Sequence, residues 1–447
     1  MLIRFIVKNL YSFKEETEFN LLPGRATRLE KHKYHRNGIT ALKQTAIYGA
    51  NGSGKSNLVK AIGCLKSLMT TGIIPYALTS QKFKLSNFTL SQPVELAIEF
   101  SSGKSIYFYS ISIQNGIILE EYFGEAGINN DKLIFSRQTD TIHFFEEFER
   151  DEKNLVLKNV IEKSLLNPQL PLFFLLHGIK EASFVDIHSA FNWIANKLIL
   201  IGTGTNANGV FIQNIDTIDG YKSFVKELLK SFNTGVVELK IDKTSFEDFF
   251  GDDYNEEVER IKEELINAPD SVKSLPKKGR FVERVALVNE NSRLVVKELL
   301  LLHNDENGNK VDFLFHEESD GTKRLLDFIP AIHQLINIDC TFIIDEMERS
   351  LHPTIIKELI SKFSSDESTK GQLIFTTHES NLLDQDIFRT DEIWFAEKSQ
   401  SGATKLYSLS DFKEHSTIDI RKGYLTGRYG AIPFLGNLHD LNWHNKD

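Results

Sequence analysis

The sequence predicts an α/β fold built around a phosphate-binding loop, and three patterns support this prediction. Residues 49–56 read Gly-Ala-Asn-Gly-Ser-Gly-Lys-Ser, a complete G-x-x-x-x-G-K-[ST] motif. An apolar strand at 341–344 ends in an acidic pair, and another at 372–377 ends in a histidine. Polar residues at the carboxyl ends of parallel strands are typical of ligand-binding α/β sheets.

The composition is that of an ordinary globular protein. The 447 residues are 41% hydrophobic and 26% charged, which allows two or three structural units. Met1 is followed directly by a strand-like run at 2–7, without a basic, apolar leader. No stretch approaches the ~20 apolar residues of a membrane helix. We therefore expect a cytoplasmic protein that does not enter the membrane.

The charge, the aromatic residues and the cysteines bear on whether the protein binds DNA or zinc. The net charge of -10 argues against a protein that coats DNA, although a basic patch on one face remains compatible with this charge. The 33 Phe residues are spread along apolar segments, which favours core packing over base stacking. Cys64 and Cys340 lie in apolar segments, so we expect buried free thiols rather than a disulfide or a zinc site.

The phosphate loop is flanked as the motif requires. A short strand is predicted at 44–48, and the helical spacing of apolar residues at 57–68 predicts the helix that follows. Backbone N–H groups and the helix N-terminus would hold a polyanionic phosphate. Lys55 would reach the β and γ phosphates, and Ser56 would ligate Mg²⁺. The predicted ATP-binding residues are Gly49, Ala50, Asn51, Gly52, Ser53, Gly54, Lys55, Ser56 and Asn57.

The next segment is predicted to be rich in antiparallel strands. Apolar and polar residues alternate at 94–100 and at 105–113, with Gly103 and Lys104 forming the turn between them. Helical periodicity then dominates from about 149 to 265, most clearly at 187–199. We interpret that region as a helical insert that is too short for a long coiled-coil arm.

Three domains follow from these patterns. Residues 1–148 form an N-terminal lobe with the phosphate loop, 149–285 a mainly helical insert and 286–447 a C-terminal lobe. The acidic stretch at 250–257 favours a solvated loop over a metal site, because its carboxylates lack the spacing of a calcium loop. Residues 305–309 are predicted to be a hairpin turn between two strands.

The C-terminal third holds the predicted catalytic groups. Asp345, at the end of an apolar strand, would hold the Mg²⁺ shell as in a Walker B segment, and Glu346 would polarise the attacking water. His378, at the end of a second strand, would contact the γ phosphate or that water. Lys55, Glu346 and His378 are thus the predicted catalytic residues.

A Ser-x-Gly turn precedes the predicted helix that begins near 320. Such a turn can cap its own helix, or it can present a hydroxyl, N–H groups and the helix dipole to a phosphate. From these residues alone the capping interpretation is preferred. The turn consists of Ser319, Asp320, Gly321 and Thr322.

In chain order, these motifs resemble the ATP-binding cassette pattern. The chain resembles the ABC-type AAA ATPases of bacterial anti-phage defence systems, which are related to the structural-maintenance-of-chromosomes (SMC) and OLD ATPases, and it is similar to the ATPase subunits of PARIS systems. The similarity extends over nearly the whole chain, including 427–433, and is weakest in the helical insert. It implies an ABC-type P-loop ATPase head with a mixed sheet, an antiparallel β subdomain and the insert.

The resemblance also assigns roles. It implies that the Ser319 turn is the signature motif, acting on ATP bound by the other subunit of a dimer, and that His378 is the switch histidine. It implies a D-loop that contains Arg349, Ser350 and His352. Gln81 is one candidate for the Q-loop glutamine. The turn departs from the Leu-Ser-Gly-Gly-Gln signature of transporters, which argues against transport.

The predicted function is therefore an ATP- and Mg²⁺-dependent ATPase that serves as sensor or scaffold for a separate toxin or nuclease, often of Toprim type, with a phage protein as trigger. The alternatives are an SMC-like DNA-repair or chromosome-maintenance ATPase, a nuclease of the OLD type, and a nucleotide-binding scaffold without turnover. About 70 residues follow His378, too few for a fused catalytic domain of typical size. We expect a homodimer or higher homo-oligomer formed through the ATP sandwich.

Overall fold

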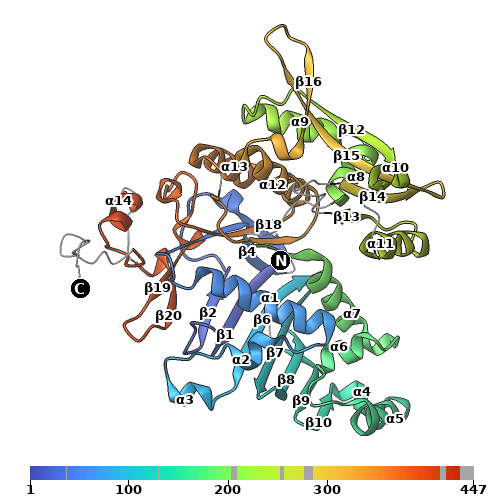
Figure 1. Cartoon of the computed structure of the whole chain (residues 1–447). Helices are drawn as coiled ribbons and strands as arrows, with labels where there is room; N and C mark the ends of the chain where they lie inside the picture. The colour runs from blue at the N-terminus through green and yellow to red at the C-terminus, as the bar shows by residue number, and fades with distance from the viewer. Residues whose placement is uncertain are drawn as a thin grey trace, which may run out of the picture. The chain divides into compact units, whose positions relative to one another are not determined.

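The computed structural model describes residues 1–36, 38–127, 131–202, 209–251, 256–275, 285–349, 351–412 and 419–432. The chain forms two compact units (Figure 1). The first contains Met1–Thr203, Leu335–Glu348 and Ile356–Asp447, and the second contains Gly204–Gln334 and Arg349–Ile355.

A six-stranded sheet forms the centre of the first unit. Its order is β11-β17-β18-β5-β19-β20, and its strands are parallel except for β20, which pairs antiparallel with β19. The three strands β5, β17 and β18 are buried along their whole length, as expected for parallel strands covered on both faces. Their bounds are β5 Gln44–Tyr48, β11 Leu198–Ile201, β17 Thr341–Ile344, β18 Gln372–Thr377, β19 Ile393–Lys398 and β20 Thr404–Ser408.

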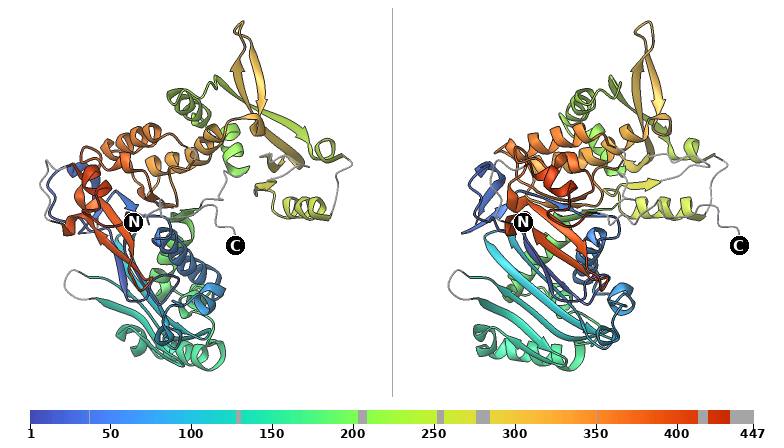
Figure 2. Two further views of the ribbon diagram at one scale, coloured as in Figure 1. Left: turned by 60° about the vertical axis from the view of Figure 1, so that its left-hand side comes forward. Right: turned by 90° about the vertical axis from the view of Figure 1, so that its left-hand side faces the viewer.

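The first unit also contains a seven-stranded antiparallel sheet, drawn in Figure 2 from two further sides, with the order β10-β9-β8-β7-β6-β1-β2. Its strands are β1 Leu2–Lys8, β2 Thr17–Asn20, β6 Val94–Ser102, β7 Ser105–Gln114, β8 Ile117–Glu125, β9 Lys132–Gln138 and β10 Thr141–Phe144. A separate hairpin pairs β3 Lys33–Arg36 with β4 Ile39–Leu42.

The helices are distributed over both units. They are α1 Lys55–Thr71, α2 Tyr76–Ser80, α3 Asn87–Leu90, α4 Glu146–Arg150, α5 Glu152–Val160, α6 Leu172–His177, α7 Val185–Asn192, α8 Gly209–Thr217, α9 Tyr221–Ser231, α10 Phe246–Phe250, α11 Glu256–Asn267, α12 Asp320–Asn337, α13 Pro353–Ser365 and α14 Ile420–Leu425. None of these helices is both long and apolar enough to span a bilayer, within the ranges given above.

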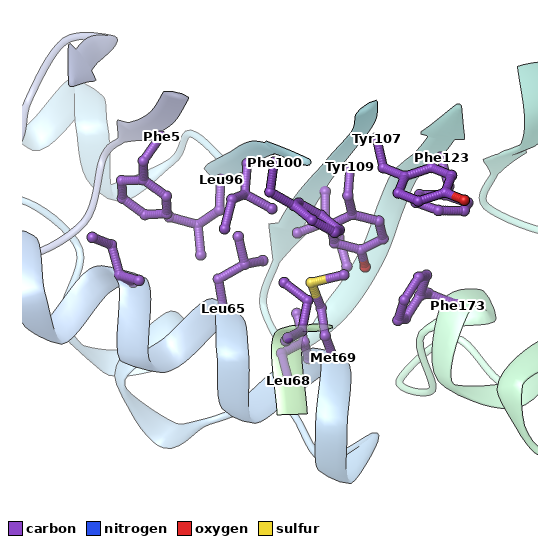
Figure 3. Packing of buried hydrophobic residues seen from close by; sticks show 14 of the residues in the cluster. Phe5, Leu65, Leu68, Met69, Leu96, Phe100, Tyr107, Tyr109, Phe123 and Phe173 are labelled. Carbon is purple, nitrogen blue, oxygen red and sulfur yellow. The ribbon is translucent and has the colours of Figure 1, made fainter. Parts of the chain in front are cut away.

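The core of the first unit lies between α1 and the antiparallel sheet (Figure 3). Leu65 and Met69 on α1 face Phe100 of β6, and each of these side chains is almost fully buried. Tyr109 of β7 meets Phe173 of α6 edge to face, with ring centroids 5.4 Å apart. Burying each such side chain contributes about 1.5–3 kcal/mol, so this core fixes the helix that carries the phosphate loop.

The second unit is built on an antiparallel sheet with the order β12-β15-β14-β13, to which β16 adds at β15. The strands are β12 Glu238–Ser245, β13 Lys273–Leu275, β14 Val285–Glu290, β15 Arg293–Asn304 and β16 Lys310–Leu314. β12 pairs with β15 as far as Leu302, whereas His303 and Asn304 pair only with β16. The far end of the β15–β16 hairpin therefore extends beyond the rest of its sheet (Figure 1).

Several predicted elements are confirmed. The strands predicted at 44–48 and 372–377 are β5 and β18, and the hairpin turn predicted at 305–309 joins β15 and β16. The predicted helix at 187–199 is wrong at its end: α7 and a π-helical turn at Trp193–Lys197 lead into β11. The region predicted to be helical also contains β12. The domain limits 1–148, 149–285 and 286–447 stay a prediction.

The two cysteines are free thiols. Cys340 is buried, and burial raises its pKa to about 12. Cys64 is half-buried beside the hydroxyl of Tyr11, and burial raises its pKa as well. Both thiols are therefore protonated and weakly nucleophilic at neutral pH.

Candidate functional site

The phosphate loop joins the end of β5 to the start of α1. Gly54 has φ +112°, a conformation that favours glycine. A Cβ on Gly54 would also lie 2.1 Å from the hydroxyl oxygen of Thr404, and one on Gly49 would lie 2.4 Å from the carbonyl oxygen of Ala396. Only glycine fits at these two positions, so the motif's glycines are required by sterics as well as by phosphate binding.

Two hydroxyl residues hold the loop from outside, and the sequence patterns do not single out either. The Thr404 hydroxyl on β20 lies 2.7 Å from both the carbonyl oxygen of Ser53 and the hydroxyl oxygen of Ser12. The Asn57 side-chain amide donates to the same Ser12 hydroxyl at 2.8 Å. Distant parts of the chain thus fix the loop's shape before any ligand is bound.

Lys55 lies at the centre of the site. Its buried ammonium donates to the carbonyl oxygens of Gly49 at 2.6 Å and Ala50 at 3.2 Å, and its Nζ lies 3.2 Å from Nδ1 of His378. Burial lowers the pKa of Lys55 to about 8, while the carboxylate of Glu348 opposes this shift. The ammonium therefore lies against the phosphate loop, where the motif requires a lysine that binds the phosphates.

The predicted Mg²⁺ ligands lie together. The hydroxyl of Ser56 donates to Oδ1 of Asp345 at 3.1 Å, and the hydroxyl of Thr376 donates to the same oxygen at 2.6 Å. The backbone N–H of Glu346 in turn donates to the Thr376 hydroxyl at 2.8 Å. Glu346 has φ +53°, a strained conformation for a residue with a Cβ. Thr376, which the sequence patterns do not single out, therefore orients both acids.

Glu348 links this acidic turn to His378. Its Oε1 accepts a hydrogen bond from the backbone N–H of His378, while its Oε2 is buried and has no hydrogen-bond partner. Partial burial lowers the pKa of His378, and the nearby Lys55 ammonium lowers it further. The imidazole is therefore held in its neutral form at neutral pH, as a hydrogen-bonding group rather than a cation.

The residues present fit ATP and Mg²⁺. The Ser56 hydroxyl and the Asp345 carboxylate are hard oxygen donors that already converge on one point, which is the chemistry Mg²⁺ prefers. The buried Ser53 hydroxyl has no hydrogen-bond partner, so the loop also retains an unsatisfied polar group. Lys55 supplies the compact positive charge that a triphosphate requires.

The Ser319 turn belongs to the second unit. Ser319 and Asp320 are exposed, and Gly321 and Thr322 lie in the first turn of α12. The Ser319 hydroxyl accepts a hydrogen bond from the backbone N–H of Thr322 at 3.1 Å. The structure therefore shows that Ser319 caps α12, one of the two interpretations left open by the sequence. The role of this turn in binding a phosphate stays a prediction.

The remaining predicted site residues are those of the D-loop and the candidate Q-loop glutamine. Arg349 is exposed in the second unit, and His352 Nδ1 accepts a hydrogen bond from the backbone N–H of Thr354 at 3.2 Å. Ser350 lies outside the described residues. Gln81 follows α2 as its C-cap residue, and its carbonyl oxygen accepts a hydrogen bond from the N–H of Tyr11 at 2.7 Å. Its assignment to a Q-loop stays a prediction.

The phosphate loop, the acids at the end of β17 and the parallel sheet together define the class of protein: a P-loop ATPase domain. Within this class, the chain belongs to the family described as "AAA domain, putative AbiEii toxin, Type IV TA system". That family's sequence profile matches residues 45–178 and 206–384, which is more than half of the chain.

Solved structures with some similarity are SMC head domains. One is an SMC head bound to the C-terminal winged-helix domain of ScpA (12% identity, TM-score 0.44, 91% of this chain and 97% of that chain). Others come from Thermotoga maritima (11%, 0.36, 91% and 98%) and, bound to the C-terminal domain of ScpA, from Pyrococcus furiosus (14%, 0.37, 96% and 98%). No curated protein matches the chain by sequence.

Proposed function

We propose that this chain is a cytoplasmic, Mg²⁺-dependent ATP hydrolase that serves as the sensor or scaffold of an anti-phage defence system and controls a separate toxin or nuclease. The observation that carries the ATPase part is the convergence of Lys55, Ser56, Asp345 and His378 at one end of the parallel sheet. The family description, with its toxin and toxin–antitoxin terms, supports the defence part.

In the proposed reaction a water attacks the γ phosphorus, the bond from that phosphorus to the β–γ bridging oxygen breaks, and ADP leaves with the bond's electrons. Glu346 accepts the proton of the attacking water. Lys55 and the loop N–H groups bind the phosphates, and neutral His378 orients the γ phosphate or the water. Mg²⁺, held by Ser56 and Asp345, would supply charge neutralisation between the β and γ phosphates.

The signature role requires a second copy of the chain. We propose that the exposed Ser319 of one subunit completes the ATP site at the phosphate loop of the other, with Arg349 and His352 near that interface. Two ATP molecules would then lie between two subunits, and an isolated monomer would bind ATP without turning it over.

The deciding experiment compares Glu346→Gln with wild type. The variant keeps the size of the side chain and loses the proton acceptor, so we expect ATP turnover to fall by about 10²–10⁴-fold while ATP stays bound. ATP turnover and native mass are measured for each protein alone and after co-expression with the product of the neighbouring gene. Glu358→Gln, an exposed position on α13, is the matched control. Normal turnover in Glu346→Gln would contradict the assignment.

The same experiment separates the proposed function from its main alternative. A wild-type ATPase that stably retains the neighbouring protein supports the sensor and scaffold role. Turnover that needs no protein partner, is stimulated by DNA and falls steeply with added salt would instead favour an SMC-like DNA-maintenance ATPase.

A further inference from the structure

The Ser319 turn is tied to the β15–β16 hairpin by one buried polar contact. Glu318, immediately before Ser319, is only 5% exposed at its side chain, and its Oε1 lies 2.6 Å from Nε2 of His303 on β15. A buried carboxylate is costly to leave without a partner, so this contact restricts where Glu318, and with it Ser319, can lie.

The His303 ring is itself held in place. It packs against the ring of Phe313 on β16, with centroids 4.6 Å apart. A Cβ at Gly235 would lie 3.2 Å from Nδ1, so the backbone of Gly235 also closely approaches the ring. His303 pairs with Val311 of β16, and its Nε2 is directed at Glu318.

The chain between the hairpin and the turn is short and ordered. β16 ends at Leu314, a single 3₁₀ turn covers Phe315–Glu317, and Glu318 and Ser319 follow directly. The N–H of Leu314 donates to the Glu317 carboxylate at 2.7 Å, and the Lys323 ammonium donates to the carbonyl oxygen of His316 at 2.9 Å. Displacement of the hairpin would therefore be passed on to the Ser319 turn, both along the backbone and through His303.

We infer that His303 is a positioning residue for ATP hydrolysis: its imidazole, fixed by the β15–β16 hairpin, sets the position of Ser319 through Glu318. The inference rests on the proposed role of Ser319 in the ATP site of a second subunit.

The test compares His303→Ala with His303→Gln, whose amide keeps a donor at the level of Nε2. We expect His303→Ala to lower kcat by roughly tenfold or more, because small displacements of a catalytic group have large effects on rate. ATP affinity, measured with a fluorescent ATP analogue, should stay at the wild-type value, since the phosphate loop is untouched. His303→Gln should restore most of kcat.

Two further variants keep the test decisive. His303→Phe retains a flat ring against Phe313 and lacks the donor, so it should lose turnover like His303→Ala and serves if the alanine variant does not fold. Asp312→Asn is the matched control, because it breaks an exposed ion pair of the same hairpin with Lys240 and leaves Glu318 untouched. It should behave as wild type.

The outcomes separate the inference from the proposed function. If Ser319→Arg is inactive, an unchanged kcat in both His303→Ala and His303→Phe would overturn the inference. An equal loss of kcat in His303→Gln and His303→Ala would overturn it as well. A wild-type chain that shows no ATP turnover, or a Ser319→Arg variant with normal turnover, would instead contradict the proposed function.

Discussion

Single hydroxyl groups decide the geometry of the phosphate site. Thr404 contacts both Ser53 of the loop and Ser12, and Thr376 contacts both Asp345 and the backbone of Glu346. Neither threonine is part of a nucleotide-binding motif. Each one positions residues that are predicted to bind ATP or Mg²⁺, and neither is predicted to contact ATP itself. At the scale of the residue, the site depends on contacts between segments far apart in the sequence.

Thr404→Val tests this dependence. Valine has the shape of threonine and lacks the hydroxyl, so the Ser53 carbonyl and the Ser12 hydroxyl would each lose a hydrogen-bond partner. Each lost hydrogen bond would cost about 1 kcal/mol of stabilisation of the loop. We expect ATP affinity to weaken by roughly five- to tenfold in an equilibrium titration, and Thr404→Ser to restore it. Equal affinity in Thr404→Val and wild type would show that the loop keeps its shape without this anchor.

The residues that the sequence could and could not predict differ in their separation along the chain. Gly49 to Ser56 form one contiguous motif whose steric requirements are local, so the loop was predictable. Thr404, Ser12 and His303 were not, because their partners are set by the tertiary fold. β11 was missed since its Leu-Ile-Leu-Ile run follows a helix without a turn signal, and a short apolar run has no period that separates strand from helix.

At the scale of the element, Lys43 joins the strand that precedes the phosphate loop to the end of α13. Its ammonium donates to the carbonyl oxygens of Ser364 at 3.2 Å and Asp366 at 2.6 Å, which are left without helical partners at the C-terminus of α13. Burial lowers the pKa of Lys43 to about 8, from the ordinary value of 10.5 for lysine.

This shift predicts a pH dependence of stability. Because the folded pKa is below the unfolded one, the unfolded chain binds more protons between pH 8 and 10.5. The free energy of unfolding should therefore rise with pH in that window, and the cost of the buried charge is fully present below pH 8. Lys55 contributes in the same direction.

Lys43→Met removes one of these two contributions. Urea unfolding at several pH values from about 8 to about 9.5 should show a smaller rise in the variant than in wild type, by roughly half of the part due to the two lysines. Lys60→Met, at an exposed position on α1, should keep the wild-type slope. A wild-type slope in Lys43→Met would mean that Lys43 is not buried as a charge in solution.

At the scale of the whole molecule, the residues with proposed roles in ATP hydrolysis belong to two different compact units. The phosphate loop, Asp345, Glu346 and His378 belong to the first unit, and the Ser319 turn belongs to the second. In the proposed homodimer, the Ser319 turn of each copy contacts the ATP bound by the phosphate loop of the other copy. The dimer would then contain two composite ATP sites, each with groups from both copies.

Mixing two inactive variants tests that arrangement. Lys55→Ala should lose ATP binding, and Ser319→Arg should bind ATP without turning it over. A dimer of one copy of each has one intact site, formed by the Ser319→Arg copy's phosphate loop and the Lys55→Ala copy's Ser319. An equal mixture should thus recover about a quarter of wild-type turnover, since half of the dimers are mixed. No recovery would contradict action across the dimer.

The two protonated thiols have a practical consequence. Maleimide dyes react with thiolates, so Cys64 and Cys340, whose pKa values are raised by burial, should label slowly at neutral pH. A cysteine introduced at Val311, which is 43% exposed on β16, would then take up a fluorophore selectively without removal of either native cysteine. The emission of that single dye would report on the hairpin during each round of nucleotide binding and release.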